Sequence, residues 1–129
     1  MVRRVHIGRS ALDALLAYGK MNHPREGILL LRGLVKSGEA FVRELVVPPL
    51  ALHGEGFSGF QPYLLPIDAS IIGVAHTHPS SDPRPSRQDL LSFMGAVGLI
   101  AAYPYEGASD VLAFDHRGQL LPLEIHEEE

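Results

Sequence analysis

Two histidines and an aspartate lie close together in the chain and have the types and spacing of metal ligands. His76 and His78 stand two residues apart, and Asp89 follows within the same fourteen-residue stretch, 76–89. Residues two apart on a β-strand face the same side, so the two imidazoles would lie side by side. Two imidazoles and one carboxylate, with a fourth position left for water, are the ligand set of a catalytic zinc site.

The surrounding residues predict the elements that would position these side chains. The run 71–75 is apolar and largely β-branched, which predicts a short buried strand leading into His76. Three prolines between 79 and 85 predict a stiff exposed loop, because proline neither continues a strand ladder nor fits a helix interior. Ser86 stands at the N-cap of a predicted helix, so Asp89 would point back toward the helix start. The apolar positions of this helix are Leu90, Leu91, Phe93, Met94 and Val97.

Each half of this pattern also has an explanation that needs no metal. A His-x-His pair on a strand is often two surface histidines, and Ser86-x-x-Asp89 before an apolar run is an ordinary capping box. Their combination within one short stretch favours the metal site over coincidence.

A hydrolytic zinc site also needs a carboxylate that accepts a proton from water and is not itself a ligand. Glu26 is the candidate, because it opens the apolar segment 26–33, which we expect to form a buried central strand. Its charge would then lie at a strand end that faces a cleft. Without the histidines, Glu26 would be interpreted as a solvated strand-end charge.

The pattern formed by Glu26, His76-x-His78, Ser86 and Asp89 resembles the JAMM motif of the JAB1/MPN/Mov34 metalloprotease family. Members of this family include zinc-dependent isopeptidases of the deubiquitinase type. The resemblance covers about residues 1 to 125, and one departure is Val74-Ala75, which replaces an aromatic pair common in eukaryotic members. Further agreement comes from Gly27, Gly33, Gly73, Pro79 and Pro85.

The resemblance implies the MPN fold, a curved mixed sheet flanked by helices and similar to cytidine deaminases, in a single domain over residues 1–129. It implies about one zinc ion per chain, held by His76, His78 and Asp89. Glu26 would be the general base, and Ser86 would donate a hydrogen bond to the oxyanion. The implied reaction is isopeptide or peptide cleavage at the C-terminal tail of a ubiquitin-like protein.

Three other functions fit parts of the sequence. Trimming of a sulfur-carrier protein requires the same chemistry, because that substrate also ends in a flexible glycine-rich tail. A noncatalytic MPN scaffold is disfavoured because all five motif positions are intact. A zinc nucleotide deaminase is disfavoured because such enzymes usually offer a Cys-x-x-Cys pair as zinc ligands, and the chain has no cysteine.

The rest of the chain predicts an α+β (mixed α/β) domain of two helices and about six strands. Residues 2–7 alternate as a half-exposed strand with His6 on its exposed side, and a helix is expected from Ser10 to a stop at Gly19. A hairpin should join 26–33 to 40–47, and a last edge strand, 119–125, is interrupted by Pro122. The long segment 48–62 carries Phe57 and Phe60. The resemblance implies that this segment helps to hold the substrate. The alternative, with equal weight, is a connector whose two phenylalanines pack on the core.

Charge and composition exclude several classes of function. The net charge of −4 and the scattered lysines and arginines argue against nucleic-acid binding. The sequence has no apolar run long enough for a membrane span and no signal-peptide pattern, so we expect a cytoplasmic protein. The partner that the JAMM resemblance implies is a ubiquitin-like or sulfur-carrier-like protein substrate.

Overall fold

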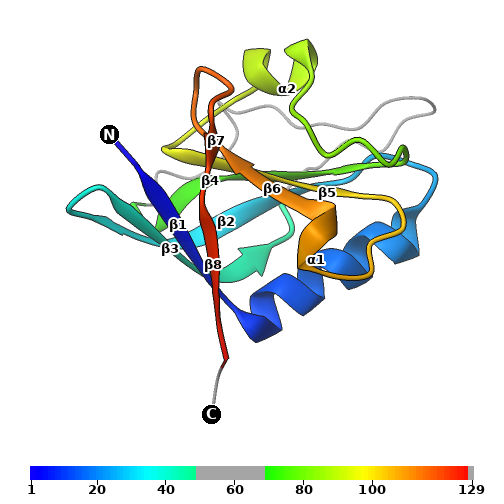
Figure 1. Ribbon diagram of the computed structural model, residues 1–129, viewed down its shortest axis with the longest axis horizontal. Helices are drawn as coiled ribbons and strands as arrows, with labels where there is room; N and C mark the ends of the chain where they lie inside the picture. The colour runs from blue at the N-terminus through cyan, green and yellow to red at the C-terminus, as the bar shows by residue number, and fades with distance from the viewer. Residues whose placement is uncertain (49–68, 128–129) are drawn as a thin grey trace.

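The computed structural model describes residues 1–48 and 69–127, which form one eight-stranded mixed sheet with helices (Figure 1). The strands are β1 (Arg4–Gly8), β2 (Ile28–Lys36), β3 (Glu39–Val46), β4 (Ile71–His78), β5 (Val97–Ala102), β6 (Val111–Phe114), β7 (Leu120–Leu121) and β8 (Leu123–His126). The helices are α1 (Arg9–Asn22), α2 (Arg87–Leu91) and a 3₁₀ helix, Ala108–Asp110. The strand order is β7-β6-β5-β4-β2-β3-β1-β8.

The sheet is curved, and its two edge strands are consecutive in the chain. Only Pro122 separates β7 from β8, although they lie at opposite ends of the strand order. The Val5 N–H donates to the Pro122 carbonyl oxygen over 2.9 Å, so the chain passes from one edge to the other beside β1. The predicted strand 119–125 is therefore two strands, divided where proline has no N–H for the ladder.

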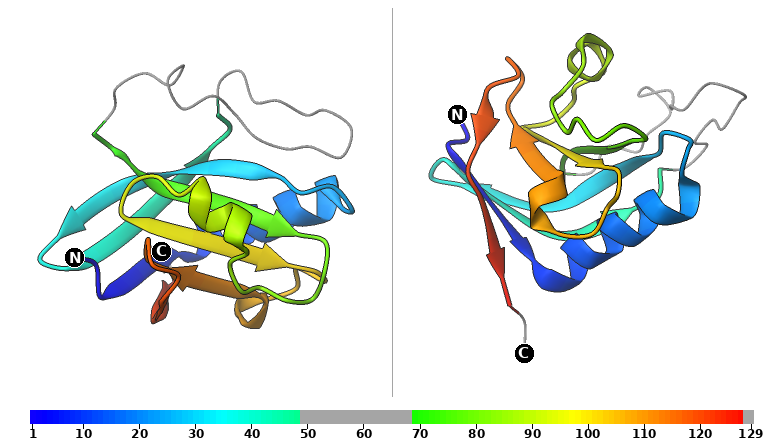
Figure 2. Two further views of the ribbon diagram at one scale, coloured as in Figure 1. Left: turned by 90° about the horizontal axis from the view of Figure 1, so that it is seen from above. Right: turned by 45° about the vertical axis from the view of Figure 1, so that its right-hand side comes forward.

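The main core lies between α1 and one face of the sheet (Figure 2). Leu12, Leu15 and Leu16 of α1 are buried against it, and full burial of one leucine stabilises a fold by about 1.5–3 kcal/mol. Alternate residues of the strands face this core, because successive strand residues point to opposite sides. The sheet residues in the core include Val5, Ile7, Leu29, Leu31, Ala40, Val42 and Ala75.

The first helix is longer than predicted. It begins at Arg9 and continues through Gly19 to Asn22, whereas the sequence predicts a start at Ser10 and a stop at Gly19. Gly19 is buried inside the helix, where an added Cβ would lie 2.5 Å from the Tyr105 ring. This glycine therefore permits close packing of the ring on α1 and does not end the helix.

The predicted hairpin forms, but the strand boundaries are shifted. Strand β2 pairs with β3 around a turn at Ser37 and Gly38, and Glu26 lies two residues before β2 instead of opening it. Strand β2 is central, with β3 on one side and β4 on the other, and Ile28 pairs with His76. This register brings the segment just before β2 to the end of β4.

The second helix is shorter than predicted. The sequence predicts helical positions as far as Val97, but α2 ends at Leu91 and Val97 opens β5. Strand β5 is buried throughout and pairs with β4 and β6, so tertiary pairing overrides the helical spacing. Gly95, with a φ of 80°, turns the chain between them.

His6 also differs from its prediction as an exposed residue. Only 9% of its surface is accessible, because its ring stacks on Phe41 and lies beside His126.

Among residues 1–48 and 69–127, no helix has both the length and the apolar character that crossing a bilayer requires.

Candidate metal centre

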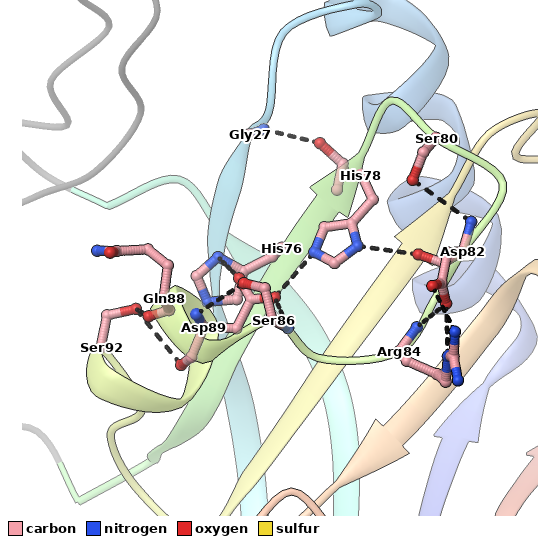
Figure 3. Close-up of polar contacts among 11 residues, drawn as sticks. Gly27, His76, His78, Ser80, Asp82, Arg84, Ser86, Gln88, Asp89 and Ser92 are labelled. Atoms are coloured by element: carbon pink, nitrogen blue, oxygen red, sulfur yellow. Dashed lines mark hydrogen bonds and ion pairs between the residues drawn. The ribbon is translucent and has the colours of Figure 1, made fainter.

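Strand β4 places His76 and His78 on the same face of the sheet, as their spacing predicts (Figure 3). Both are buried, with exposures of 9% and 8%. They share this face with Val74, which packs with Ile28 and Leu30 in a second cluster away from α1. The imidazoles therefore lie on the side of the sheet opposite to the main core.

A capping box at the start of α2 places Asp89 against these histidines. The Ser86 N–H donates to Asp89 Oδ2 over 2.8 Å, and the Asp89 N–H donates to Ser86 Oγ over 3.1 Å. The Asp89 carboxylate is 3% exposed. The capping box and the metal site are therefore compatible explanations, because the cap itself fixes the carboxylate that faces the imidazoles.

Both oxygens of Asp89 face a histidine. Asp89 Oδ2 accepts a hydrogen bond from His78 Nε2 over 2.9 Å, and Asp89 Oδ1 lies 3.6 Å from His76 Nδ1. His78 Nδ1 donates to the Asp82 carbonyl oxygen over 3.1 Å, and Figure 3 shows His78 between the two aspartates. A second hydrogen bond of this kind fixes the orientation of an imidazole, here with Nε2 directed at the carboxylate.

The electrostatics of the cluster favour a cation. Burial lowers the pKa of His76. Burial also acts to lower the pKa of His78, but hydrogen bonds to Asp89 and Asp82 and the charges of Asp89 and Glu26 raise it overall. Burial acts to raise the pKa of Asp89, yet its bonds to His78 and the Ser86 N–H and the nearby histidine charges lower it to about 2. An ionised carboxylate facing two imidazoles is a donor set that suits zinc.

Glu26 reaches the same place from the segment before β2. Glu26, His78 and Asp89 each offer a ligand atom within 4.8 Å of the other two. We call Glu26, His76, His78 and Asp89 the β4 cluster. His76 joins the other three through its 3.6 Å approach to Asp89, and Glu26 is the exposed member. Its proximity is compatible with a role as base or as ligand.

Thr77 ties Glu26 to β4, a role that the sequence analysis missed. The Gly27 N–H donates to Thr77 Oγ1 over 2.7 Å, and the Thr77 N–H donates to the Gly27 carbonyl oxygen over 3.1 Å. Thr77 is 1% exposed and lies between the two histidines. A buried hydroxyl requires a partner, so a threonine inside a buried strand was the available signal.

Tyr105 supports the end of β4 and was also missed. Its hydroxyl donates to the His78 carbonyl oxygen over 3.0 Å and accepts from His23 Nδ1 over 3.0 Å. The His23 ring stacks on Tyr103, with centroids 4.7 Å apart. These contacts join residues far apart in the chain, and no local spacing indicates them.

An open hollow of about 420 Å³ adjoins the β4 cluster. Asp82 on its wall is bound by Arg84 over 2.9 Å, a contact that lowers the pKa of Asp82 to about 2. The hollow is lined by His78, Ser80, Asp82, Arg84, Pro85 and Ser86.

Phe57 and Phe60, the predicted substrate contacts, lie in 49–68, outside the described residues.

Comparisons with known proteins identify relatives over nearly the whole chain. The family model for prokaryotic homologs of the JAB domain matches residues 8–116. A protein of Haloferax volcanii described as a probable metalloprotease is 32% identical over 128 residues, covering 94% of this chain and 79% of that protein.

Solved structures show the same fold. A JAB1/MPN domain protein from Archaeoglobus fulgidus superposes with a TM-score of 0.68 at 27% identity, covering 95% of this chain and 97% of that one. A structure described as JAMM, a metalloprotease-like zinc site in the proteasome and signalosome, gives 0.67 at 27% identity, covering 98% and 100%. The predicted α+β MPN fold is therefore confirmed, and the chain belongs to the family of prokaryotic homologs of the JAB domain.

Proposed function

We propose that this protein is a zinc-dependent peptidase that cleaves at the C-terminal tail of a ubiquitin-like protein, including isopeptide bonds. One observation carries the proposal: Glu26, His78 and Asp89 meet within 4.8 Å beside an open hollow, with His76 on the same buried strand. The similarity to a probable metalloprotease supports the same class of reaction.

The β4 cluster offers the residues to hold the metal. In this proposal His76, His78 and Asp89 hold about one zinc ion per chain, because two imidazoles and a carboxylate leave one position open for reaction. Zinc bound there would supply Lewis-acid chemistry, lowering the pKa of water and polarising a carbonyl group. The Asp82 carbonyl oxygen and the Ser86 N–H orient His78 and Asp89 from outside the ligand set.

Two side chains at the rim would move or stabilise charge during hydrolysis. Glu26 is exposed, so its carboxylate can take a proton from the attacking water and return it to the leaving amine. Ser86 Oγ accepts a hydrogen bond from the Asp89 N–H, which uses an oxygen lone pair and not the hydroxyl hydrogen. The Ser86 hydroxyl can therefore donate to the oxygen that becomes negative as the carbonyl is attacked.

The ubiquitin-like substrate is the finer part of the proposal. It is supported by the JAMM resemblance and by an open hollow at the cluster that an extended, glycine-rich tail could enter. In this view, apolar contacts from Phe57 and Phe60 help to align the tail. Alignment affects the rate as well as binding, because a displaced carbonyl loses its reactive geometry.

Matched carboxylate-to-amide variants test the reaction. Glu26→Gln keeps the side-chain shape but cannot accept a proton, so kcat should fall by about 10²–10⁴-fold while zinc content is retained. Glu106→Gln makes the same change at an exposed glutamate outside the β4 cluster and should cleave like the wild type. Ser86→Ala should lose about 10²-fold in kcat.

The substrates in this assay are a ubiquitin-like protein joined through its C-terminal glycine to a reporter, once by a linear peptide bond and once by a lysine isopeptide bond. Cleavage after the terminal glycine supports the proposal. Loss of zinc in Glu26→Gln would make Glu26 a ligand instead of the base. If the protein cleaves a sulfur carrier with a blocked tail and cleaves neither conjugate, the peptidase activity stands and the sulfur carrier becomes the substrate.

A further inference from the structure

A second histidine cluster lies on β1 and β8, the two neighbouring strands at one end of the strand order. His6 Nδ1 and His126 Nε2 are 2.7 Å apart, although the residues are 120 positions apart in the chain. Strands β1 and β8 are parallel, with His6 beside Glu124, so Glu124 and His126 project from the same face as His6. Val5 and Ile7 face the main core, which directs His6 to the face opposite α1.

Glu39 determines which nitrogen of His6 is free to bind. Its Oε1 contacts His6 Nε2, and because a carboxylate only accepts, the hydrogen of the imidazole lies on Nε2 and is donated to it. The Nδ1 lone pair then faces His126, whose Nε2–H donates to it. A histidine ligand commonly donates its other N–H to a carboxylate in this way, which fixes its orientation toward a metal.

The third donor comes from β8. Glu124 Oε1 lies 3.7 Å from His126 Nε2, and Arg4 binds the other oxygen, Oε2, over 3.3 Å. His6, Glu124 and His126 each offer a ligand atom within 4.8 Å of the other two. A cation placed between the two imidazoles, where the hydrogen of their hydrogen bond now lies, could therefore bind His6 Nδ1, His126 Nε2 and a carboxylate oxygen of Glu124.

We propose that His6, Glu124 and His126 form a second divalent-metal site, separate from the β4 cluster, with Glu39 as the outer partner of His6. We call these four residues the β1 cluster. Two imidazole nitrogens with one carboxylate oxygen suit zinc, nickel or copper, whereas calcium and magnesium prefer oxygen ligands alone. The two glutamates bring negative charge that a divalent cation would balance beside Arg4.

The position of the site suggests what a bound ion does. Strand β8 is an edge strand of four residues, and its outward residues Glu124 and His126 are exposed. A metal ion joining His6 to these residues would cross-link the last strand to the first. A ligand that binds only the folded chain raises its stability by mass action, so the site should stabilise the attachment of β8.

Zinc stoichiometry in two single variants and their combination tests the proposal. His126→Gln removes an exposed ligand, whereas His6→Gln would disturb a buried ring, so His126 is the residue to change. After incubation with zinc chloride and gel filtration, the wild type should hold about two zinc ions per chain. His126→Gln and Asp89→Asn should each hold about one, and the double variant none.

Two further measurements isolate the β1 cluster. Glu39→Gln should weaken the second zinc site about 10- to 100-fold without removing it, as expected for an outer partner. His116→Gln changes an exposed histidine outside both clusters and should bind zinc like the wild type. Copper added to the Asp89→Asn protein should show imidazole nitrogen couplings in its EPR spectrum that are lost in the Asp89→Asn/His126→Gln double variant, and an unchanged spectrum would count against the site.

The outcome that overturns the proposal is equal zinc binding by the wild type and His126→Gln. The zinc contents of the wild type and His126→Gln decide whether the second site exists even if Asp89→Asn fails to fold, because both proteins retain the β4 cluster. An Asp89→Asn chain that folds and binds no zinc would also overturn it, since the β1 cluster would then be only a hydrogen-bonded anchor for β8.

Discussion

The two histidine clusters lie on the same face of the sheet but differ in how the chain builds them. The β4 cluster is next to Ile28 at the start of β2, whereas His6 pairs with Phe41, which pairs with Leu34 six residues further along β2. Six strand residues span about 20 Å, so the clusters occupy opposite ends of the strand. Each contains two histidines and two carboxylates, but their supports are different.

The β4 cluster is held from several sides. Strand β4 lies between β2 and β5, the capping box fixes Asp89, and the Asp82 carbonyl oxygen orients His78. The β1 cluster depends on β8, whose only neighbour in the sheet formed by residues 1–48 and 69–127 is β1. The comparison indicates that a rigid central strand suits precise chemistry, whereas an edge strand suits an ion that stabilises the fold.

The largest expected effect separates the clusters at Asp89. Asp89→Asn removes the charge but retains an oxygen that can accept from the Ser86 N–H, so the helix cap should persist. We expect the β4 cluster to lose zinc and hydrolysis to fall below detection, because one of the three proposed ligands loses its negative charge. Zinc analysis and the reporter assay measure both effects.

Asp110→Asn is the matched control for this change. Asp110 Oδ2 accepts from the Glu106 N–H, so this variant also replaces a backbone-binding aspartate with asparagine, outside both clusters. It should retain zinc and activity. Full zinc content in Asp89→Asn would leave the capping box as the sole role of Asp89 and would remove it from the proposed ligand set.

The sequence predicts the β4 cluster well because its information is local. The ligand candidates lie within 76–89, and the strand period, the prolines and the Ser86 cap each determine a direction over a few residues. Glu26 lies far from this stretch in the chain, and its choice rests on its place before an apolar segment and on the need for a base, to which the JAMM resemblance adds support. The contact of His6 with His126 depends on the parallel pairing of β1 with β8, strands that lie far apart in the sequence, and no local period determines that pairing.

The errors in the fold have a related cause. Local preferences predict a helix stop at Gly19 and the last apolar position of a helix at Val97. In the structure, Gly19 remains helical because the Tyr105 ring packs against it, and Val97 is extended because β5 pairs on both sides. Contacts between distant segments decide both positions, and they outweigh local preferences of about 1 kcal/mol or less.

An intermediate effect is expected at Thr77, which tests whether support from the sheet matters to the β4 cluster. Thr77→Val removes the hydroxyl that accepts from the Gly27 N–H, leaving that buried donor without its partner. This should reduce stability by about 1–3 kcal/mol. Displacement of Glu26 should lower kcat about tenfold while zinc is retained.

Thr77→Ser keeps the hydroxyl and is the control for that variant. It should recover most of the lost activity, although one methyl group is removed from a buried site. Denaturant unfolding and the reporter assay together decide the question. Equal losses of activity in the valine and serine variants would show that packing of the methyl group, and not the bond to Gly27, positions Glu26.

The smallest expected effect is that of the β1 cluster on hydrolysis. His126→Gln changes the β1 cluster, whose His6 is level with Leu34 of β2, six residues from the Ile28 that pairs with His76. Among the described residues the two clusters share no hydrogen bond, so the two sites should behave independently. We expect kcat/KM to change by less than about twofold, while zinc raises the Tm of the wild type more than that of the variant. Melting curves with and without zinc chloride, recorded beside the reporter assay, separate the two readouts. A large loss of activity in His126→Gln with the β4 zinc still bound would show that the edge of the sheet is coupled to the reaction, and the division between a catalytic cluster and a stabilising one would fail.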